Sequence, residues 1–162
     1  MKKIFSIVVV LAVLLLLSSA IEPQHRGIKV GYTAPDIKVG DTTLYEPGQY
    51  SEGYTLIHFW ASYDASSRIA NMMYSKTVEQ FDSSLIRYLA VSYEYNEALY
   101  GEIVKRDKLS TRSQYYDAAG KSSNLYEQYR LNKGFATYLI DAHGRIVAQN
   151  PDKTTIESIL GQ

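Results

Sequence analysis

Three residues near the middle of the chain have the side-chain types of a hydrolase triad. His58, Asp64 and Ser67 supply an imidazole, a carboxylate and a hydroxyl within one short stretch. Such a triad works only when the three groups meet at hydrogen-bond distance. The alternative is a buried histidine that merely satisfies its own hydrogen bonds, because His58 lies inside an apolar run. We favour this alternative, and a structure that separates His58 from the Ser67 hydroxyl would exclude the triad.

A strand, a tight turn and a helix are expected to position these residues. Residues 55–60 form an apolar run of strand length preceded by Gly53, which predicts a buried strand. Asp64 follows in the turn, where a carboxylate accepts backbone N–H bonds and meets the positive end of a helix dipole. We therefore expect Asp64 to be the N-cap of a helix over residues 65–81. The apolar positions expected on one face of this helix are Ile69, Met72, Met73, Val78 and Phe81.

The remaining segments alternate between strand and helix patterns. Before the buried strand, residues 37–39 and 42–45 predict a hairpin. After the first helix we expect a strand over 85–93, a helix over 97–108, an irregular segment over 109–123 and a short helix from the capping residue Asn124 to Tyr129. A strand over 136–140, a turn, a returning strand over 145–148 and a helix after Pro151 complete the chain. This order predicts one α/β domain with a central mixed β-sheet, helices on both faces and an N-terminal β-hairpin.

The N-terminus has the features of a signal peptide over residues 1–20. Lys2 and Lys3 precede an apolar stretch of about 14 residues, and Ser18-Ser19-Ala20 suits signal peptidase. The stretch is short for a transmembrane helix, which needs roughly 20 residues, so we favour cleavage after Ala20 over an uncleaved anchor. We then expect a linker over 21–30 and a domain over 31–162 that is exported to the periplasm.

The composition excludes several classes of function. The sequence contains no cysteine, which rules out disulfides, lipid-modified cysteine, thiol chemistry and cysteine metal sites. Basic and acidic residues number 17 each, so the charge gives no indication of nucleic-acid binding. His25, His58 and His143 fall in different predicted elements without close ligand spacing. We therefore expect no metal and no other cofactor.

Three motifs in this order resemble the thioredoxin-like superfamily, in particular its exported bacterial thiol–disulfide oxidoreductases, the redoxins. Residues 31–36 are similar to the Gly-x-x-Ala-Pro-Asp entry of these domains. Residues 59–63 resemble their Phe-Trp-Ala-x-Trp lead into the active site, and residues 138–146 resemble their Phe-Leu-Ile-Asp-x-x-Gly-x-Ile hairpin. With the order of elements, the resemblance covers nearly all of residues 28–162 and implies a thioredoxin-like fold.

The chain departs from this family at its chemistry. The family's Cys-x-x-Cys motif falls on the four residues from Asp64 to Ser67, and its cis-proline falls on Phe135. No proline lies between Pro47 and Pro151, so a shifted alignment does not restore one. Because a non-proline cis bond costs about 3 kcal/mol, we expect the bond before Phe135 to be trans. Thiol–disulfide exchange needs a thiolate, so the resemblance implies the fold without the family's reaction.

Two functions from different classes remain. The first is a redox-inactive module that binds a peptide or protein partner through the former active-site groove or through a tyrosine-rich face. The groove candidates are Trp60, Tyr63, Asp64, Arg68 and Phe135. The candidate face contains Tyr93, Tyr95, Tyr100, Tyr115 and Tyr116. The second is an enzyme with a rebuilt site at His58, Asp64, Ser67 and Arg68. In either case we expect membrane contact only through an uncleaved N-terminal segment.

Overall fold

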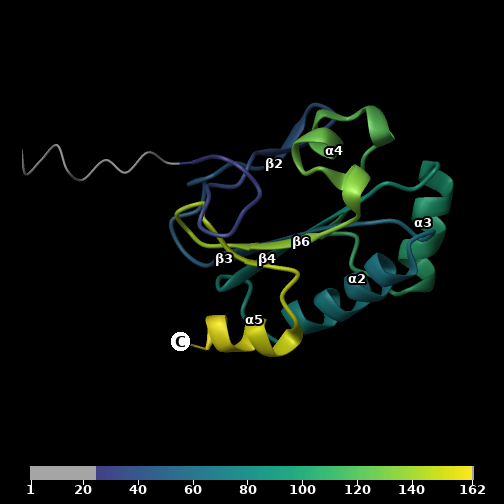
Figure 1. The fold of residues 1–162 in the computed structure, drawn as a ribbon. Coiled ribbons are helices and arrows are strands. Elements are labelled where there is room, and N and C mark those ends of the chain that lie inside the picture. Colours follow the sequence, from purple (N-terminus) through teal and green to yellow (C-terminus); the bar gives the residue numbers. More distant parts are fainter. Residues whose placement is uncertain (1–24, 162) are drawn as a thin grey trace, which may run out of the picture.

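A five-stranded sheet forms the middle layer of the domain (Figure 1). The computed structural model describes residues 25–161, so the predicted signal peptide and the first four residues of the predicted linker lie outside the described residues. The strand order is β5-β4-β3-β6-β7. The strands are β3 (Tyr54–Trp60), β4 (Ile86–Ser92), β5 (Gln114–Tyr116), β6 (Thr137–Ile140) and β7 (Ile146–Gln149). β3, β4 and β5 run parallel while β6 pairs antiparallel with β3 and β7, which confirms the predicted mixed sheet.

Helices cover both faces of this sheet (Figure 1). One face carries α2 (Ala65–Val78), α3 (Glu97–Arg106) and α5 (Lys153–Leu160). The other carries α4 (Asn124–Gln128), flanked by the 3₁₀ turns η1 (Gly120–Ser122) and η2 (Leu131–Lys133), and the hairpin of β1 (Ile37–Val39) and β2 (Thr42–Tyr45). The predicted α/β architecture with an N-terminal hairpin is therefore confirmed. None of the helices in residues 25–161 is both long enough and apolar enough to cross a bilayer.

β3 divides its side chains between the two halves of the core. Leu56 and Trp60 pack with the layer of α2, α3 and α5, whereas Ile57 and Phe59 pack with α4 and the hairpin. Successive side chains of a strand point to opposite faces, so His58 lies on the α2 side, where its ring contacts Tyr74. Because both faces are covered, every residue of β3 from Thr55 to Trp60 is buried, on either side of the sheet.

Gly53 allows the chain to enter β3. Its φ is +76°, and a Cβ atom there would collide with the backbone carbonyl oxygen of Ser84. The backbone of Tyr54 then donates to the carbonyl of Leu85 at 2.8 Å. The glycine therefore marks a close approach between two backbones, as well as the conformational change that begins the strand.

The inward face of α2 is more polar than the sequence predicts. Ile69, expected on the buried face, is 62% exposed, whereas Asn71 is fully buried. Asn71 Nδ2 donates to Gln114 Oε1 at 3.0 Å, and Asn71 Oδ1 accepts from the Tyr88 hydroxyl at 2.7 Å and from Gln114 Nε2 at 3.1 Å. These hydrogen bonds offset the desolvation of the amides, so a polar stripe can face the sheet. The expected apolar face was therefore wrong at Ile69.

Other differences concern short segments and helix ends. β5 lies within the segment predicted to be irregular, and it pairs with β4 through Ala90 and Gln114. The α4 helix is capped by Ser123, whose hydroxyl accepts from the backbone of Tyr126 at 3.2 Å, and not by Asn124. The α2 helix ends at Val78 rather than at 81, and α3 ends at Arg106 rather than at 108.

Candidate functional site

The turn between β3 and α2 holds Asp64 as an N-cap, as predicted. Its Oδ1 accepts from the Ser67 backbone N–H at 2.8 Å and from the Ser66 hydroxyl at 2.7 Å. These two hydrogen bonds, the backbone one first, hold the pKa of Asp64 below its usual value. The turn therefore presents a fixed negative charge at the start of the helix.

The Ser67 hydroxyl is used within the same turn. Ser67 is 5% exposed, and its Oγ donates to the Asp64 backbone carbonyl at 3.0 Å. The backbone N–H of Ala61 in turn donates to Oγ at 3.3 Å. These contacts tie the end of β3 to the first turn of α2. Ser67 is thus a structural residue that presents almost no surface to a substrate.

His58 lies in the core beneath the turn with both ring nitrogens occupied. Its Nε2 lies 2.9 Å from the Ser67 carbonyl oxygen, and its Nδ1 lies 2.8 Å from the Thr137 hydroxyl. Because a carbonyl oxygen only accepts, Nε2 carries the proton and Nδ1 accepts from Thr137 in the neutral ring. Burial lowers the pKa of His58 to about 4, so the ring is neutral near pH 7.

This arrangement does not form the hydrolase triad that the residue types allowed. The imidazole is bonded to the backbone carbonyl of Ser67, and among residues 25–161 it makes no hydrogen bond to the hydroxyl of that residue. No nitrogen lone pair is left to take a proton from a nucleophile, because Nδ1 accepts from Thr137. The enzyme hypothesis built on these residues is wrong in this respect, and His58 is the satisfied core histidine.

Arg68 is also committed to the structure. Its guanidinium forms a two-point ion pair with Asp107, with Nε–Oδ2 and Nη2–Oδ1 distances of 2.7 and 2.6 Å. The Asp107 side chain is 5% exposed and follows the last turn of α3. The pair therefore joins the beginning of α2 to the end of α3. Arg68, expected to contact a partner or substrate, is occupied instead.

Trp60 lies in the core and not at the rim of a groove. It is fully buried, and its ring lies 6.4 Å from that of Tyr100 on α3. Tyr100 in turn stacks on Tyr116 at 5.6 Å. The expected tyrosine-rich face is therefore divided, since Tyr100 lies between Trp60 and Tyr116 while Tyr93 and Tyr95 lie near the turn. The assignment of Trp60 to the groove was wrong. Successive side chains of β3 alternate between the two faces of the sheet, so Trp60 points into the core on the same face as Leu56 and His58.

Five aromatic side chains surround the turn; we call Tyr63, Tyr93, Tyr95, Tyr126 and Phe135 the aromatic cluster. The centroid distances are 4.9 Å for Tyr63–Tyr95, 6.2 Å for Tyr63–Phe135, 6.0 Å for Tyr93–Phe135 and 5.2 Å for Tyr93–Tyr126. Tyr95 is 77% exposed and Tyr63 is 46% exposed. No cis peptide bond occurs in residues 25–161, so the bond before Phe135 is trans, as predicted. The cluster draws on the segments that follow β3 and β4, on α4 and on the segment before β6, which meet only in the folded chain.

Glu94 is a site residue that sequence reasoning missed. It is 4% exposed, and its two carboxylate oxygens accept from the backbone N–H and the hydroxyl of Ser62. The Tyr63 hydroxyl donates to the backbone carbonyl of Tyr93 at 3.3 Å. Glu94 therefore fixes the turn just before Tyr63. The available signal was its position directly after an apolar strand parallel to β3, which places both at the same edge of the sheet.

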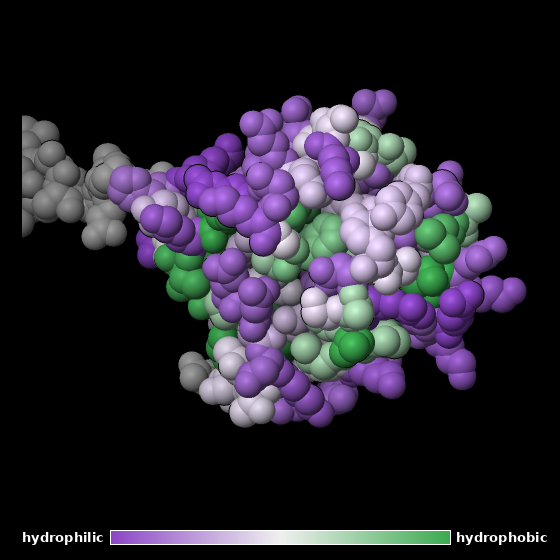
Figure 2. Space-filling view, turned by 45° about the vertical axis from the view of Figure 1, so that its right-hand side comes forward, coloured by the Kyte–Doolittle hydropathy of each residue, from purple (hydrophilic) through white to green (hydrophobic). Residues whose placement is uncertain are grey.

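The exposed part of the cluster is mainly Tyr63 and Tyr95, whose side chains each combine an apolar ring with a polar hydroxyl. On the face drawn in Figure 2, hydrophobic side chains form separate small areas among hydrophilic ones.

A cavity of about 590 Å³ lined by Val78, Ile86 and Arg87 lies elsewhere, near the amino end of β4. Because β3 and β4 are parallel, that cavity and Asp64 lie at opposite ends of the sheet. The described residues include no group of three or more His, Cys, Asp or Glu side chains placed to hold a metal.

Comparison with solved structures gives close matches in fold. The chain is 34% identical to a thioredoxin-like protein from Parabacteroides distasonis, covering 85% of this chain and 98% of that one with a TM-score of 0.77. It is 22% identical to the thioredoxin domain of a thiol–disulfide oxidoreductase from Bacteroides vulgatus, covering 83% and 99% with a TM-score of 0.68. A thiol:disulfide interchange protein from a Bacteroides species is 21% identical, covering 83% and 92% with a TM-score of 0.69. No family model and no curated protein matches the chain.

Proposed function

The chain belongs to the thioredoxin-like superfamily, and we propose that it is a redox-inactive member that binds a peptide or protein partner through the aromatic cluster. It has no cysteine, and Asp64 and Ser67 stand where the family's motif has its two sulfurs. Serine at its ordinary pKa does not replace a thiolate in disulfide exchange. The fold is therefore retained around a site with a different use.

The observation that carries this proposal is the exposure of Tyr63 and Tyr95 beside half-buried Phe135. Tyrosine offers a large apolar surface and a polar hydroxyl with few rotatable bonds, and it is enriched among the residues that dominate binding energy at interfaces. The Ser67 hydroxyl, the Ser67 carbonyl and Oδ1 of Asp64 are already hydrogen-bonded within the chain. What remains to meet another molecule is mainly aromatic surface.

The proposed location of this binding is the periplasm. Support comes from the sequence of residues 1–20, where two lysines, an apolar stretch and small residues follow the order of a signal peptide. If this segment is not cleaved, it tethers the domain to the membrane. The cluster is then presented to partners outside the cytoplasm, and the balanced charge of the chain gives nucleic acid no role.

Two experiments test the proposal. The purified protein is expected to show no reduction of insulin disulfides, and turnover above background would contradict the loss of redox activity. Crosslinking followed by mass spectrometry on the exported fraction is expected to capture a partner with the native chain. Tyr63→Ala and Phe135→Ala are expected to weaken this capture roughly 5- to 30-fold, since central aromatic residues contribute about 1–2 kcal/mol to binding.

A matched control separates the cluster from exposed apolar surface in general. Leu85 is 45% exposed, close to the 46% of Tyr63, and lies just before β4 at the other end of the sheet. Leu85→Ala is expected to leave capture unchanged. If Tyr63→Ala and Phe135→Ala capture as much as the native chain, the cluster is not the binding surface.

A further inference from the structure

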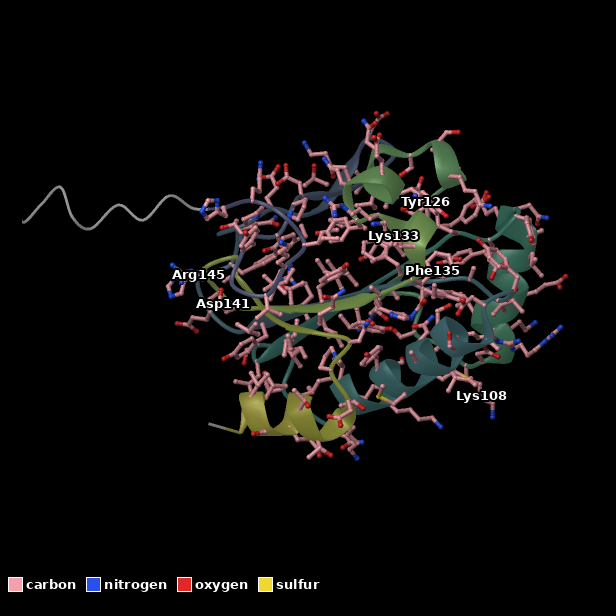
Figure 3. All side chains as sticks on the ribbon, viewed as in Figure 1. Lys108, Tyr126, Lys133, Phe135, Asp141 and Arg145 are labelled. Carbon is pink, nitrogen blue, oxygen red and sulfur yellow. The ribbon has the colours of Figure 1, made fainter. Side chains whose placement is uncertain are left out.

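A cavity with a basic lining adjoins the aromatic cluster. It has a volume of about 550 Å³, and we call it the basic cavity; its lining residues are Lys121, Tyr126, Glu127, Arg130, Asn132 and Lys133. Tyr126 belongs to both the basic cavity and the aromatic cluster. A second cavity of about 300 Å³ is lined by Arg130, Lys133 and Phe135. Figure 3 shows Tyr126, Lys133 and Phe135 near one another, between α4 and the start of β6. The cations and the aromatic residues therefore form one continuous surface.

The three cations of this surface are not neutralised by the fold. Within residues 25–161, no carboxylate oxygen lies within 4.0 Å of the charged groups of Lys121, Arg130 or Lys133. All three residues are exposed. Glu127 supplies one carboxylate to the same lining, so cations exceed anions there. The sequence as a whole is balanced at 17 basic and 17 acidic residues, so this excess is local.

The backbone that carries Arg130 and Lys133 is held by its own hydrogen bonds. Arg130 has a left-handed conformation with φ of 52°, and its backbone N–H donates to the Glu127 carbonyl at 2.9 Å. The N–H of Lys133 donates to the Arg130 carbonyl at 2.9 Å. The turn between α4 and η2 is thus closed by its own hydrogen bonds. A ligand that meets Arg130 and Lys133 therefore orders only their side chains.

The charge on the other side of the cluster has the opposite sign. Asp64, a carboxylate whose lone pairs are only partly used by Ser66 and Ser67, lies next to Tyr63 in the chain. Glu94 is bound to Ser62 in the same turn. The cluster is therefore flanked by carboxylates at the turn before α2 and after β4, and by cations at η1 and η2. Such an arrangement favours one orientation of a charged ligand over the reverse.

From this geometry we propose that the partner is a peptide segment that carries an aromatic or apolar side chain with acidic residues on one side of it. This inference rests on the proposed function. It adds the charge of the bound peptide and the direction in which the peptide lies across the cluster. The apolar side chain contacts Tyr63, Tyr95 and Phe135. The acidic residues contact Lys121, Arg130 and Lys133, and they point away from Asp64, which would repel them.

The first test selects peptides without assuming a sequence. Phage-displayed random dodecapeptides are selected on the immobilised full chain, with Phe135→Ala as the counter-target. We expect the selected peptides to be enriched in Asp and Glu on one side of an aromatic or apolar residue. Peptides that depend on Phe135 but show no acidic enrichment would overturn the charge assignment and leave the proposed function standing. Failure to enrich any Phe135-dependent peptide would overturn both.

The second test measures charge dependence with one selected acidic peptide by fluorescence anisotropy. The variant Lys121→Glu/Arg130→Glu/Lys133→Glu is expected to weaken binding roughly 10- to 100-fold, because each exposed ion pair contributes only a small energy. Lys121→Gln/Arg130→Gln/Lys133→Gln is expected to have a smaller effect in the same direction. Raising the salt concentration is expected to weaken binding to the native chain, since exposed charges are screened.

The control for net charge is Lys38→Glu/Lys76→Glu/Lys105→Glu, which changes three exposed lysines on β1, α2 and α3. It alters the net charge of the chain by the same amount as the first variant. We expect binding to change less than about threefold, because these charges lie outside the basic cavity. Equal weakening by both variants would show a dependence on total charge alone and would overturn the site. Circular dichroism on each variant verifies that the fold is retained.

Discussion

The two sides of the turn between β3 and α2 use their polar and aromatic residues in opposite ways. On the inner side, His58, Ser67 and Asn71 are buried, and their hydrogen-bonding atoms pair with other parts of the chain. On the outer side, Tyr63 and Tyr95 have large exposed surfaces. The inner residues have the types that suggest catalysis, yet they stabilise the fold. The outer residues are not of the triad types, yet they are the exposed ones.

This contrast shows that residue type alone is a poor guide to a functional site. An imidazole, a hydroxyl and a carboxylate close in sequence can each be consumed by an adjacent backbone group, as happens at Ser67 and Asp64. Whether a polar group can act on another molecule depends on its exposure and on its free lone pairs, which are properties of the folded chain. Substitutions on the inner side should therefore change stability, and substitutions on the outer side should change binding.

The largest expected effect is at His58. Replacing His58 with Ala removes a buried ring and leaves the Thr137 hydroxyl and the Ser67 carbonyl without their partners. We expect the free energy of unfolding to fall by about 3–4 kcal/mol, from the cavity and the unpaired groups together. Urea unfolding followed by circular dichroism measures this. A loss below about 1 kcal/mol would show that the inner side is not the stabilising one.

The next effect is a dependence of stability on pH. The pKa of His58 is lowered from 6.5 to about 4 in the folded chain, so the unfolded chain binds the proton more readily. Stability is then complete above pH 6.5 and falls by roughly 3 kcal/mol as the pH drops to about 4. Urea unfolding of the native chain and of His58→Gln across this range isolates the contribution. Identical slopes in the two proteins would contradict it.

A smaller effect is expected at Asp64, on the boundary between the two sides. Asp64→Ala removes the cap of α2 and should cost about 1 kcal/mol, whereas Asp64→Asn should cost only a few tenths because asparagine also caps. The pKa of Asp64 is lowered, so its charge stabilises the fold above about pH 4 and this contribution is lost as the pH falls through the lower folded pKa. Thermal unfolding at pH 7 compares the two variants. Equal losses would argue against a capping role.

The smallest effect on stability is expected at Tyr95. With 77% of its surface exposed, Tyr95→Ala should change the free energy of unfolding by less than about 0.5 kcal/mol. The same substitution is expected to weaken binding of a Phe135-dependent peptide several-fold, as read by anisotropy. The contrast between the two sides would fail if Tyr95→Ala destabilised the chain as strongly as His58→Ala.

The elements that could be predicted from sequence are those with local signals. The apolar run of β3, Gly53 before it and Asp64 after it mark both ends of the strand-to-helix unit, and all three have the expected roles. The hairpin before β3 has the predicted bounds, 37–39 and 42–45. In each case the determining groups lie within a few residues of one another, so the pattern needs no knowledge of the rest of the fold.

The residues assigned wrongly depend on contacts between distant segments. The helix pattern alone gives Arg68 no partner, but in the folded chain its guanidinium donates to Asp107 at the end of α3. The three residues of β5 have little strand pattern of their own, and β4 provides the edge that orders them. Glu94 can be buried because the backbone N–H and the hydroxyl of Ser62 donate hydrogen bonds to its carboxylate. The aromatic cluster likewise joins four segments, so only its separate members were visible in the sequence.

The amide pair of Asn71 and Gln114 beneath α2 has a consequence for how this chain can diverge. A substitution of either residue alone leaves buried polar atoms of the other without partners, which costs about 1–3 kcal/mol. Replacing both residues by apolar groups of matching shape can be nearly neutral. Descendants of this sequence should therefore exchange positions 71 and 114 together, with Tyr88 adjusting as the third member. Correlated change at these sites would record the packing of α2 on β5.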